Sequence, residues 1–197
     1  MKPPESIQTS RLTLRRLAME DADAIFAAYA QDAEVTRFLT WRPHRRIEDT
    51  RAFIQKTIEA WDGGTEFAWA IRRRDGELIG GIALRHQEFK VDFGYVIARA
   101  QWGNGFAAEA LQSLVDWAMT QPEVFRVWAV CDVENAASAR VMEKVGMTRE
   151  GILRRWIRHP QAGDPPRDCL CYSIVKKPGG QPATTPHSEP TARLRQG

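Results

Sequence analysis

Two glycines in the stretch QWGNGFAAEA, residues 101–110, suggest a main-chain anion site. Gly103 and Gly105 flank Asn104, and small residues follow at the start of an amphipathic helical pattern. A helix N-terminus exposes unpaired N–H groups and the positive end of the helix dipole, and glycine has no Cβ to hold a bulky anion away from them. The stretch therefore predicts phosphate binding at the start of a helix.

Two known phosphate-binding patterns compete for this stretch. A Walker loop is excluded because no lysine followed by serine or threonine comes after the last glycine. GNGFAA matches the dinucleotide pattern G-x-G-x-x-A, and Asp132, 24 residues after Ala108, is a candidate ribose ligand. However, ARAQW separates the apolar strand from Gly103, and three probable antiparallel strands precede it. A dinucleotide site remains a remote alternative.

A second candidate site lies in VCDVENAASARVMEKVGM, residues 130–147. The segment is typical of a strand, an N-x-x-S turn and a helix that ends at Gly146. Asn135 is either a ligand contact or only a helix N-cap, for which asparagine is favoured. Ser138 is either catalytic or a solvated serine in the first helical turn.

The elements that position these residues follow from periodicity. The order is β-α-α-β-β-β-α-β-α-β-β, which predicts a mixed α/β (α+β) domain whose front half is largely antiparallel. The predicted strands cover residues 11–17, 66–74, 78–87, 91–98, 125–131, 147–157 and 168–175, and the predicted helices cover 20–31, 47–61, 105–119 and 135–145.

Composition bounds the class of protein. The chain has 197 residues, 43% hydrophobic and 27% charged, and a formal net charge of +3, which suits one globular domain without a nucleic-acid-binding arm. Neither an apolar run of ~18 residues nor a signal-peptide core is present, so we expect no membrane partner and a cytoplasmic location. Three cysteines lack metal-ligand spacing, so no metal is expected.

The two motifs and the opening SRLTLRRL together resemble the GNAT superfamily of acetyl-CoA-dependent N-acetyltransferases. Within it the sequence is similar to the RimJ/RimL type, which acetylates ribosomal-protein N-termini. The resemblance covers roughly residues 9–176, leaving an N-terminal tail, 1–8, and a C-terminal tail, 177–197, that is expected to be disordered. It implies the acyl-CoA N-acyltransferase fold, a mostly antiparallel sheet flanked by helices, with two strands splayed at the cofactor cleft.

The resemblance also implies residue roles. The strand 91–97 is expected to splay from the next strand at a bulge. Ser138, which takes the place of a tyrosine found in other branches of the family, is expected to lie near the sulfur of the thioester and act as general acid. Asn135 is expected to hydrogen-bond the pantetheine or the acceptor. The pantetheine arm and thioester would be held by the main chain of Tyr95, Val96 and Ile97. The pyrophosphate would be bound by the backbone amides of Gly103, Asn104, Gly105, Phe106 and Ala107. Phe38 and Trp41, with Arg42 and His44 in the same loop, are expected to wall the acceptor slot.

The sequence departs from the family pattern at two places. Ala100 stands where the loop usually has glutamine or arginine, three residues before the first glycine. The segment EGILRRWIRHP has no glutamate to serve as a base, and its arginines would disfavour a cationic amine nearby. Conceivable substitutes for the base are Asp92, Glu88, His86, His159 and Asp168.

The resemblance implies transfer of an acetyl group from acetyl-CoA to a primary amine by direct attack. The acceptor would be a protein N-terminal α-amine or a weakly basic small amine, with no nucleic-acid partner, and the protein would be a monomer or a homodimer. Because the glutamate is missing, a non-catalytic acyl-CoA-binding or regulatory module is the alternative.

Overall fold

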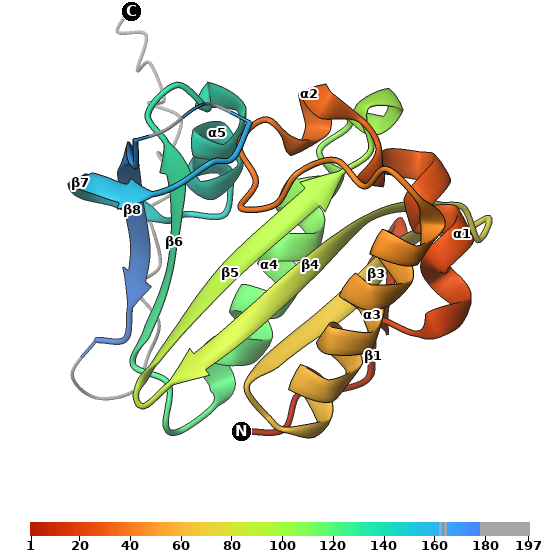
Figure 1. The fold of residues 1–197 in the computed structure, drawn as a ribbon. Helices are drawn as coiled ribbons and strands as arrows, with labels where there is room; N and C mark the ends of the chain where they lie inside the picture. The colour runs from red at the N-terminus through yellow and green to blue at the C-terminus, as the bar shows by residue number, and fades with distance from the viewer. Residues whose placement is uncertain (162, 164, 178–197) are drawn as a thin grey trace, which may run out of the picture.

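The computed structural model describes residues 1–161, 163 and 165–177. Within these residues one sheet has eight strands in the order β1-β2-β3-β4-β5-β6-β8-β7 (Figure 1). Every neighbouring pair is antiparallel except β5 and β6, so the expected mixed and mostly antiparallel sheet is confirmed. The strands are β1 (Ser6–Gln8), β2 (Leu12–Arg16), β3 (Glu66–Arg73), β4 (Leu78–Gln87), β5 (Lys90–Ile97), β6 (Arg126–Asp132), β7 (Thr148–Ile157) and β8 (Arg167–Val175).

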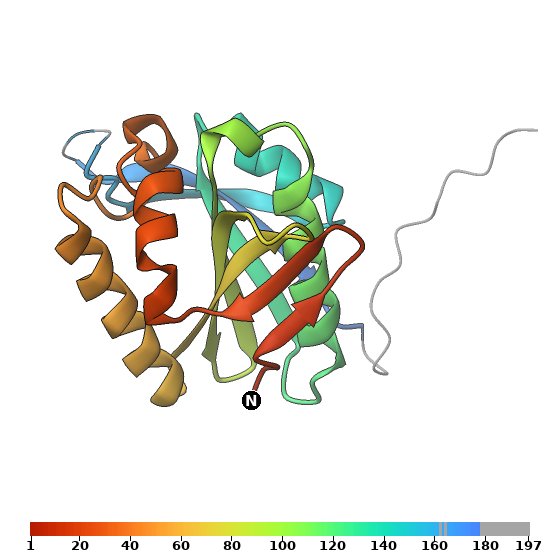
Figure 2. The ribbon, with the colours of Figure 1, turned by 90° about the vertical axis from the view of Figure 1, so that its right-hand side faces the viewer.

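Helices cover both faces of this sheet. Figure 2 shows α1 and α3 on one face and α4 on the other. Each long helix packs through one apolar stripe, which in α3 includes Ile54 and Trp61 and in α4 includes Leu111 and Leu114. The helices are α1 (Ala22–Ile25), α2 (Ala33–Thr36), α3 (Ile47–Asp62), α4 (Phe106–Thr120) and α5 (Ala136–Lys144), with 3-10 turns at Met19–Asp21 and Arg99–Gln101 and a π turn at Phe26–Ala30.

Three differences from the sequence-based elements concern the N-terminal third. β1 lies inside the segment 1–8 expected as a tail, where it pairs with β2. The continuous helix predicted over 20–31 is divided into a 3-10 turn, α1 and a π turn. The first of these turns holds Asp21, which is fully buried and accepts hydrogen bonds from Arg15 and Arg72. A further short helix, α2, begins where Asp32 caps the N–H of Glu34 at 2.9 Å.

The strands β5 and β6 diverge at the centre of the sheet. They pair only at Lys90, Val91 and Asp92 of β5, and Figure 1 shows them opening apart beyond this point. The predicted splay is therefore confirmed. The predicted bulge is wrong, because β5 pairs with β4 along its whole length without a shift in register. Beyond Asp92 and Trp128 the two strands are no longer paired, while β6 pairs along its whole length with β8 on its other edge.

Nothing in the described residues is long and apolar enough to form a membrane-crossing helix. The predicted C-terminal tail, from residue 178 onward, lies outside the described residues.

Candidate active site

The space between the splayed strands is a cavity of about 630 Å³, here called the turn cavity. One wall is the C-terminal half of β5, and the other walls are the first turns of α4 and α5. Ten of the twelve residues singled out in the sequence for cofactor, catalytic or acceptor roles line it, all except Asn104 and Trp41. They are Phe38, Tyr95, Val96, Ile97, Gly103, Gly105, Phe106, Ala107, Asn135 and Ser138.

The glycine turn before α4 has the geometry of an anion site. Gly105 is the N-cap of α4 with φ of 79°, and Gly103 has φ of 80°, conformations that strongly favour glycine. No atom lies within 4 Å of a Cβ built on Gly103. Among the described residues, none accepts a hydrogen bond from the N–H groups of Gly103, Asn104 or Gly105. These groups are available to an anion at the helix N-terminus.

Glu109 anchors this turn to the rest of the fold. Its Oε1 accepts hydrogen bonds from Thr9 Oγ1 at 2.6 Å and Arg11 N at 2.9 Å, and its Oε2 pairs with Arg11 Nε at 2.6 Å. Burial opposes the charge of Glu109, but these hydrogen bonds outweigh it and lower its pKa. Arg11 also donates to the carbonyl of Asn104 at 3.0 Å. The β1–β2 turn therefore fixes the start of α4.

The first turn of α5 presents a hydroxyl pair. Asn135 is the N-cap, and its Oδ1 accepts from Ser138 N at 3.1 Å. Ser138 Oγ lies 2.7 Å from the phenolic oxygen of Tyr95 on β5. Burial raises the pKa of Tyr95, so this phenol keeps its proton. The side chain of Tyr95 is a site component that the sequence reading missed, because it assigned only the main chain of this residue.

Charged side chains border the turn cavity. Three are basic and two are acidic, and Arg37 lies 3.7 Å from one acid, Glu134. The basic residues are Arg37, Arg140 and Lys144, and the acidic ones are Glu34 and Glu134. The excess of positive charge favours an anionic ligand.

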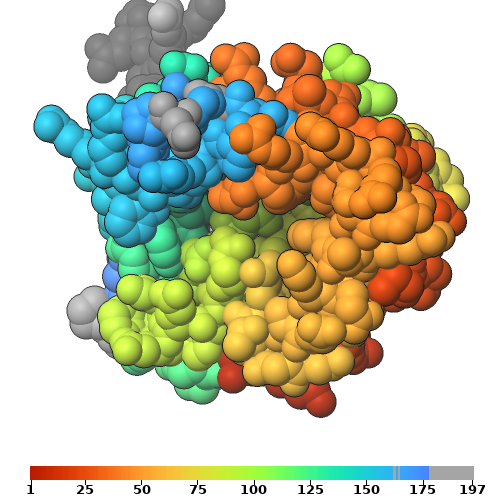
Figure 3. All heavy atoms as spheres, viewed as in Figure 1, coloured from red at the N-terminus to blue at the C-terminus, as the bar shows by residue number. Residues whose placement is uncertain are grey.

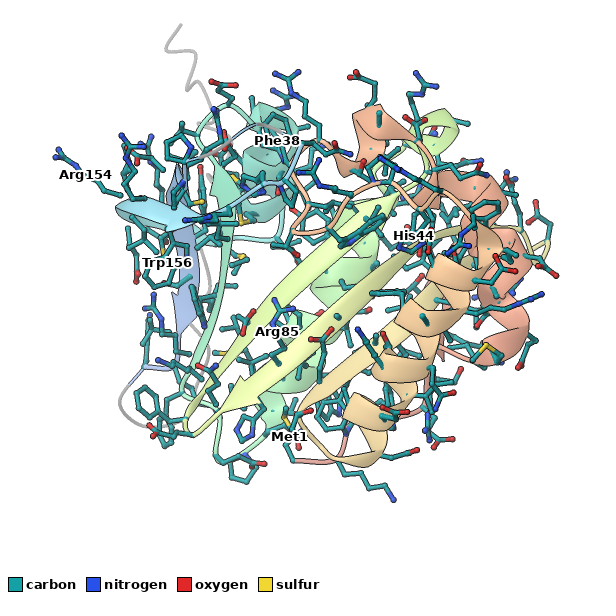
Figure 4. All side chains as sticks on the ribbon, viewed as in Figure 1. Met1, Phe38, His44, Arg85, Arg154 and Trp156 are labelled. Carbon is teal, nitrogen blue, oxygen red and sulfur yellow. The ribbon has the colours of Figure 1, made fainter. Side chains whose placement is uncertain are left out.

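A second cavity of about 540 Å³ opens on the face of the sheet and is here called the face cavity. Figure 3 shows the surface hollowed between the orange N-terminal segment and the blue C-terminal strands. Phe38, Trp156 and Arg85 line it, and Figure 4 shows Phe38 at the top, Trp156 at the left and Arg85 lower down on the sheet. The two cavities share six lining residues, namely Phe38, Leu39, Tyr95, Val96, Asn135 and Ser138. They therefore meet at the hydroxyl pair.

The loop after α2 supplies one wall of the face cavity, as the sequence predicted. Phe38 and Trp41 both line it, whereas Arg42 and His44 do not. His44 lies behind the wall, with its ring centroid 4.9 Å from that of Trp41. Trp41 is therefore held by aromatic packing with one side toward the cavity.

Of the five suggested bases, two line the face cavity, Asp92 and His159. His159 is buried, with Nδ1 3.4 Å from the carbonyl of Leu39 and Nε2 3.7 Å from Asp132. Glu88, His86 and Asp168 lie elsewhere, and Asp168 accepts from the N–H of Arg155. A further acid that the sequence reading missed, Glu66, lines the face cavity. Glu66 is the first residue of β3, and only the alignment of β3 with β4 and β5 in the sheet brings it to the face cavity.

Two other groups at β6 bear on chemistry. Cys131 lines the face cavity, and burial raises the pKa of its thiol to about 12. Asp132 is fully buried and hydrogen-bonded to Arg167, so it cannot reach a ribose. Together with the antiparallel strands before the glycine turn, this shows that the dinucleotide alternative is wrong.

Metal-binding clusters were sought across the part of the chain that the structure describes. No group of three or more His, Cys, Asp or Glu side chains there could hold a metal ion.

The two joined cavities form a cleft with one end at the N-termini of α4 and α5 and the other end on the open face of the sheet. The GNAT acetyltransferase domain model matches residues 11–148, and the chain belongs to this family. It is an acyltransferase.

Three comparisons with individual proteins agree with this assignment. The chain is 37% identical over 174 residues to the uncharacterized N-acetyltransferase YoaA of Bacillus subtilis, covering 86% of this chain and 96% of that protein. It is 30% identical over 111 residues to the ribosomal-protein-serine acetyltransferase of Escherichia coli, covering 55% of this chain and 62% of that protein. The structure of the ribosomal L7/L12 α-N-protein acetyltransferase RimL with coenzyme A has a TM-score of 0.77 at 21% identity, covering 87% of this chain and 98% of that one.

Proposed function

We propose that the protein transfers an acetyl group from acetyl-CoA to a primary amine by direct attack. The observation that carries the proposal is that the turn cavity and the face cavity meet at Tyr95, Val96, Asn135 and Ser138. One substrate can therefore enter from each side of the sheet opening and bring its reacting atom to the hydroxyl pair.

The residues of the turn cavity fit coenzyme A. A Cβ at Gly103 would project into space that no protein atom fills, and the free N–H groups of the glycine turn can bind the pyrophosphate. Arg140 and Lys144 supply positive charge for the phosphates. Beyond Asp92, β5 has no described pairing with β6, so its main chain is available to the pantetheine arm. Bound acetyl-CoA supplies an activated acetyl thioester.

At the junction, the hydroxyl pair can deliver a proton. We assign Ser138 as the general acid that protonates the departing sulfur, with the protonated phenol of Tyr95 at 2.7 Å to orient or resupply it. N–H groups of β5 beyond Asp92 would stabilise the developing oxyanion. In this assignment Asn135 positions Ser138 through its hydrogen bond to the backbone N–H.

Direct attack is favoured over an acetyl-enzyme route. Cys131 is the only thiol among the lining residues of either cavity in the described chain, and with a pKa of about 12 it stays protonated. A protonated thiol is a poor nucleophile.

The acceptor that we favour is a protein N-terminal α-amine or a weakly basic small amine. The similarity to an acetyltransferase of ribosomal-protein serine and to RimL supports the first of these. The open face cavity, with aromatic walls at Phe38 and Trp41, suits an extended peptide end. A cytoplasmic location and a monomeric or dimeric state stay predictions.

The test is an acceptor panel. The protein is incubated with acetyl-CoA and peptides with free or blocked N-termini, lysine derivatives and small amines, and CoA release and acetylated product are measured. We expect turnover that requires a free α-amine or weakly basic amine. CoA binding in calorimetry with no acetylated product from any acceptor would favour the non-catalytic alternative.

A further inference from the structure

A row of charged side chains crosses the floor of the face cavity. Glu66 on β3 lies opposite Arg85 on β4, and Arg85 lies opposite Asp92 on β5. Directly opposite residues project from the same side of a sheet, and all three line the face cavity. Figure 4 shows Arg85 on this open side of β4. We call Glu66, Arg85 and Asp92 the charged row.

The charged row carries one net negative charge when its members are ionised. Arg85 Nε donates to Asp92 Oδ2 at 2.8 Å, and Arg85 Nη1 lies 3.6 Å from Glu66 Oε2. Burial opposes the charge of Arg85, but the hydrogen bonds and charge of Asp92 outweigh it and raise its pKa. Within the described chain, Asp92 Oδ1 and Glu66 Oε1 accept no hydrogen bond. The row therefore keeps two acceptor atoms and one uncompensated charge.

Aromatic side chains flank the charged row. Trp128 on β6 lies opposite Asp92, and Phe53 of α3 and Trp156 of β7 line the same cavity. The side chain of Trp156 is 51% exposed, so its ring is open to a ligand. Acids beside aromatic rings favour an organic cation over an anion.

The arginines of EGILRRWIRHP do not line the face cavity. Arg154, Arg155 and Arg158 are absent from the residues that line either cavity. Figure 4 shows Arg154 pointing away from the molecule. The expectation that these arginines disfavour a cationic amine nearby stays a prediction.

The distance along β5 between the junction of the cavities and the charged row sets which residue of an acceptor peptide can place a cationic side chain at the row. Val96, at the junction of the cavities, is four residues from Asp92, which is about 13 Å along a strand. Between them the floor is made of small residues, Ala68, Ala83 and Gly94, which leave room for a chain. An extended peptide advances about 3.3–3.6 Å per residue, so the charged row lies almost four residue steps beyond the first residue, and the fourth or fifth residue reaches it.

We infer that the charged row selects acceptors that carry a cationic side chain, such as that of arginine, at the fourth or fifth residue, counting the residue with the reacting N-terminal amine as the first. The inference rests on the proposed function for the position of the reacting amine. Glu66 is a specificity-determining residue in this inference, because Arg85 neutralises the carboxylate of Glu66 less than that of Asp92.

The experiment compares peptides that differ at one position. The series has a free N-terminal serine, no lysine, and arginine, glutamine or glutamate at position two, three, four or five, and arginine is used because its guanidinium is not an acetyl acceptor. We expect kcat/KM to favour arginine over glutamine by about tenfold at position four or five. In Glu66→Gln the preference should fall below about twofold, and Glu66→Lys should favour glutamate instead.

Glu77→Gln is the matched control. Glu77 also pairs with an arginine, Arg73, at 2.9 Å, and lines neither cavity, so this variant should keep the preference. Equal kcat/KM for all three side chains at every position, or a preference that survives in Glu66→Gln, would overturn the inference.

Failure of the proposed function gives a different result. If no peptide is acetylated, calorimetry with CoA present compares binding of the arginine and glutamine peptides to the wild type and to Glu66→Gln. Arginine-selective binding that Glu66→Gln abolishes would uphold the charged row while refuting acetyl transfer. Unselective binding would overturn the inference.

Discussion

At the scale of single residues, the hydroxyl pair of Ser138 and Tyr95 is the group that we propose protonates the leaving thiolate. Their oxygens lie 2.7 Å apart, and either hydroxyl can donate to the other. Burial keeps the phenol of Tyr95 protonated, so the pair holds two protons at neutral pH. Ser138 is placed by Asn135 and Tyr95 by β5, which gives the proton donor a fixed position.

Removing the serine hydroxyl should therefore slow the chemical step. Ser138→Ala is expected to lower kcat by ~10²-fold or more with little change in KM for acetyl-CoA, since the lost group acts in proton transfer. Steady-state kinetics on the best acceptor of the panel measure this. Ser113→Ala is the control, because Ser113 hydrogen-bonds within α4 at 2.8 Å and lines neither cavity. A kcat for Ser138→Ala within twofold of wild type would leave Ser138 as a helix-start residue only.

Residues differ in how far sequence alone predicts them. Asn135 and Ser138 lie in one short motif, so their proximity follows from helical geometry. The phenol of Tyr95 reaches Ser138 from 43 residues away, and Glu66 meets Arg85 only through strand register. Sequence patterns give the faces of strands but not which strands are neighbours or how they are aligned. The general-acid site was therefore predictable in part, and the charged row was not.

At the scale of elements, the regular helices and strands were predictable and the connections between them were not. Strong periodicity gave α3, α4, α5 and the central strands within a few residues. The short elements β1 and α2 have too few residues for a period. The divergence of β5 from β6 followed from the family resemblance, but the point at which it begins, beyond the pair Asp92 and Trp128, is known only from the structure.

The glycine turn before α4 gives the prediction at this scale. Gly105→Val should weaken CoA binding well over tenfold, because a branched residue strains φ of 79° and displaces N–H groups that make two or three charge-assisted bonds of ~1.5–3 kcal/mol each. Calorimetric titration with CoA measures the loss.

A second glycine serves as the control for backbone strain. Gly76 in the β3–β4 turn has φ of 90°, and no atom lies within 4 Å of its added Cβ, so Gly76→Val carries similar strain away from both cavities. Circular dichroism checks that both variants fold. Unchanged CoA affinity in folded Gly105→Val, or an equal loss in Gly76→Val, would contradict the role of the turn.

At the scale of the whole molecule, one sheet borders both cavities, and we propose that each cavity takes one substrate. The turn cavity lies where β5 and β6 part, and the face cavity lies over the floor formed by β3, β4 and β5.

A strong base is not required if the acceptor amine is already neutral when it binds. At pH 7 a peptide α-amine with pKa ~7.7–8.0 is about a tenth neutral, whereas a lysine amine with pKa ~10.4 is neutral in about 4 parts in 10⁴. The neutral fraction alone favours the α-amine by about 300-fold.

The pH dependence of acetylation should therefore follow the acceptor. For matched peptides, one with a free α-amine and one with only a lysine amine, we expect the α-amine peptide to react far faster at pH 7, with kcat/KM rising with pH and levelling near the pKa of that amine. The thiol of Cys131, with a pKa of about 12, stays protonated over pH 6–9 and adds no step to the profile. Product measured by mass spectrometry gives both profiles, and KM for acetyl-CoA at each pH controls for cofactor binding. Equal turnover of the lysine peptide at pH 7, or a plateau below pH ~6.5, would reveal a base in the face cavity, where His159 and Asp92 are the residues to replace next.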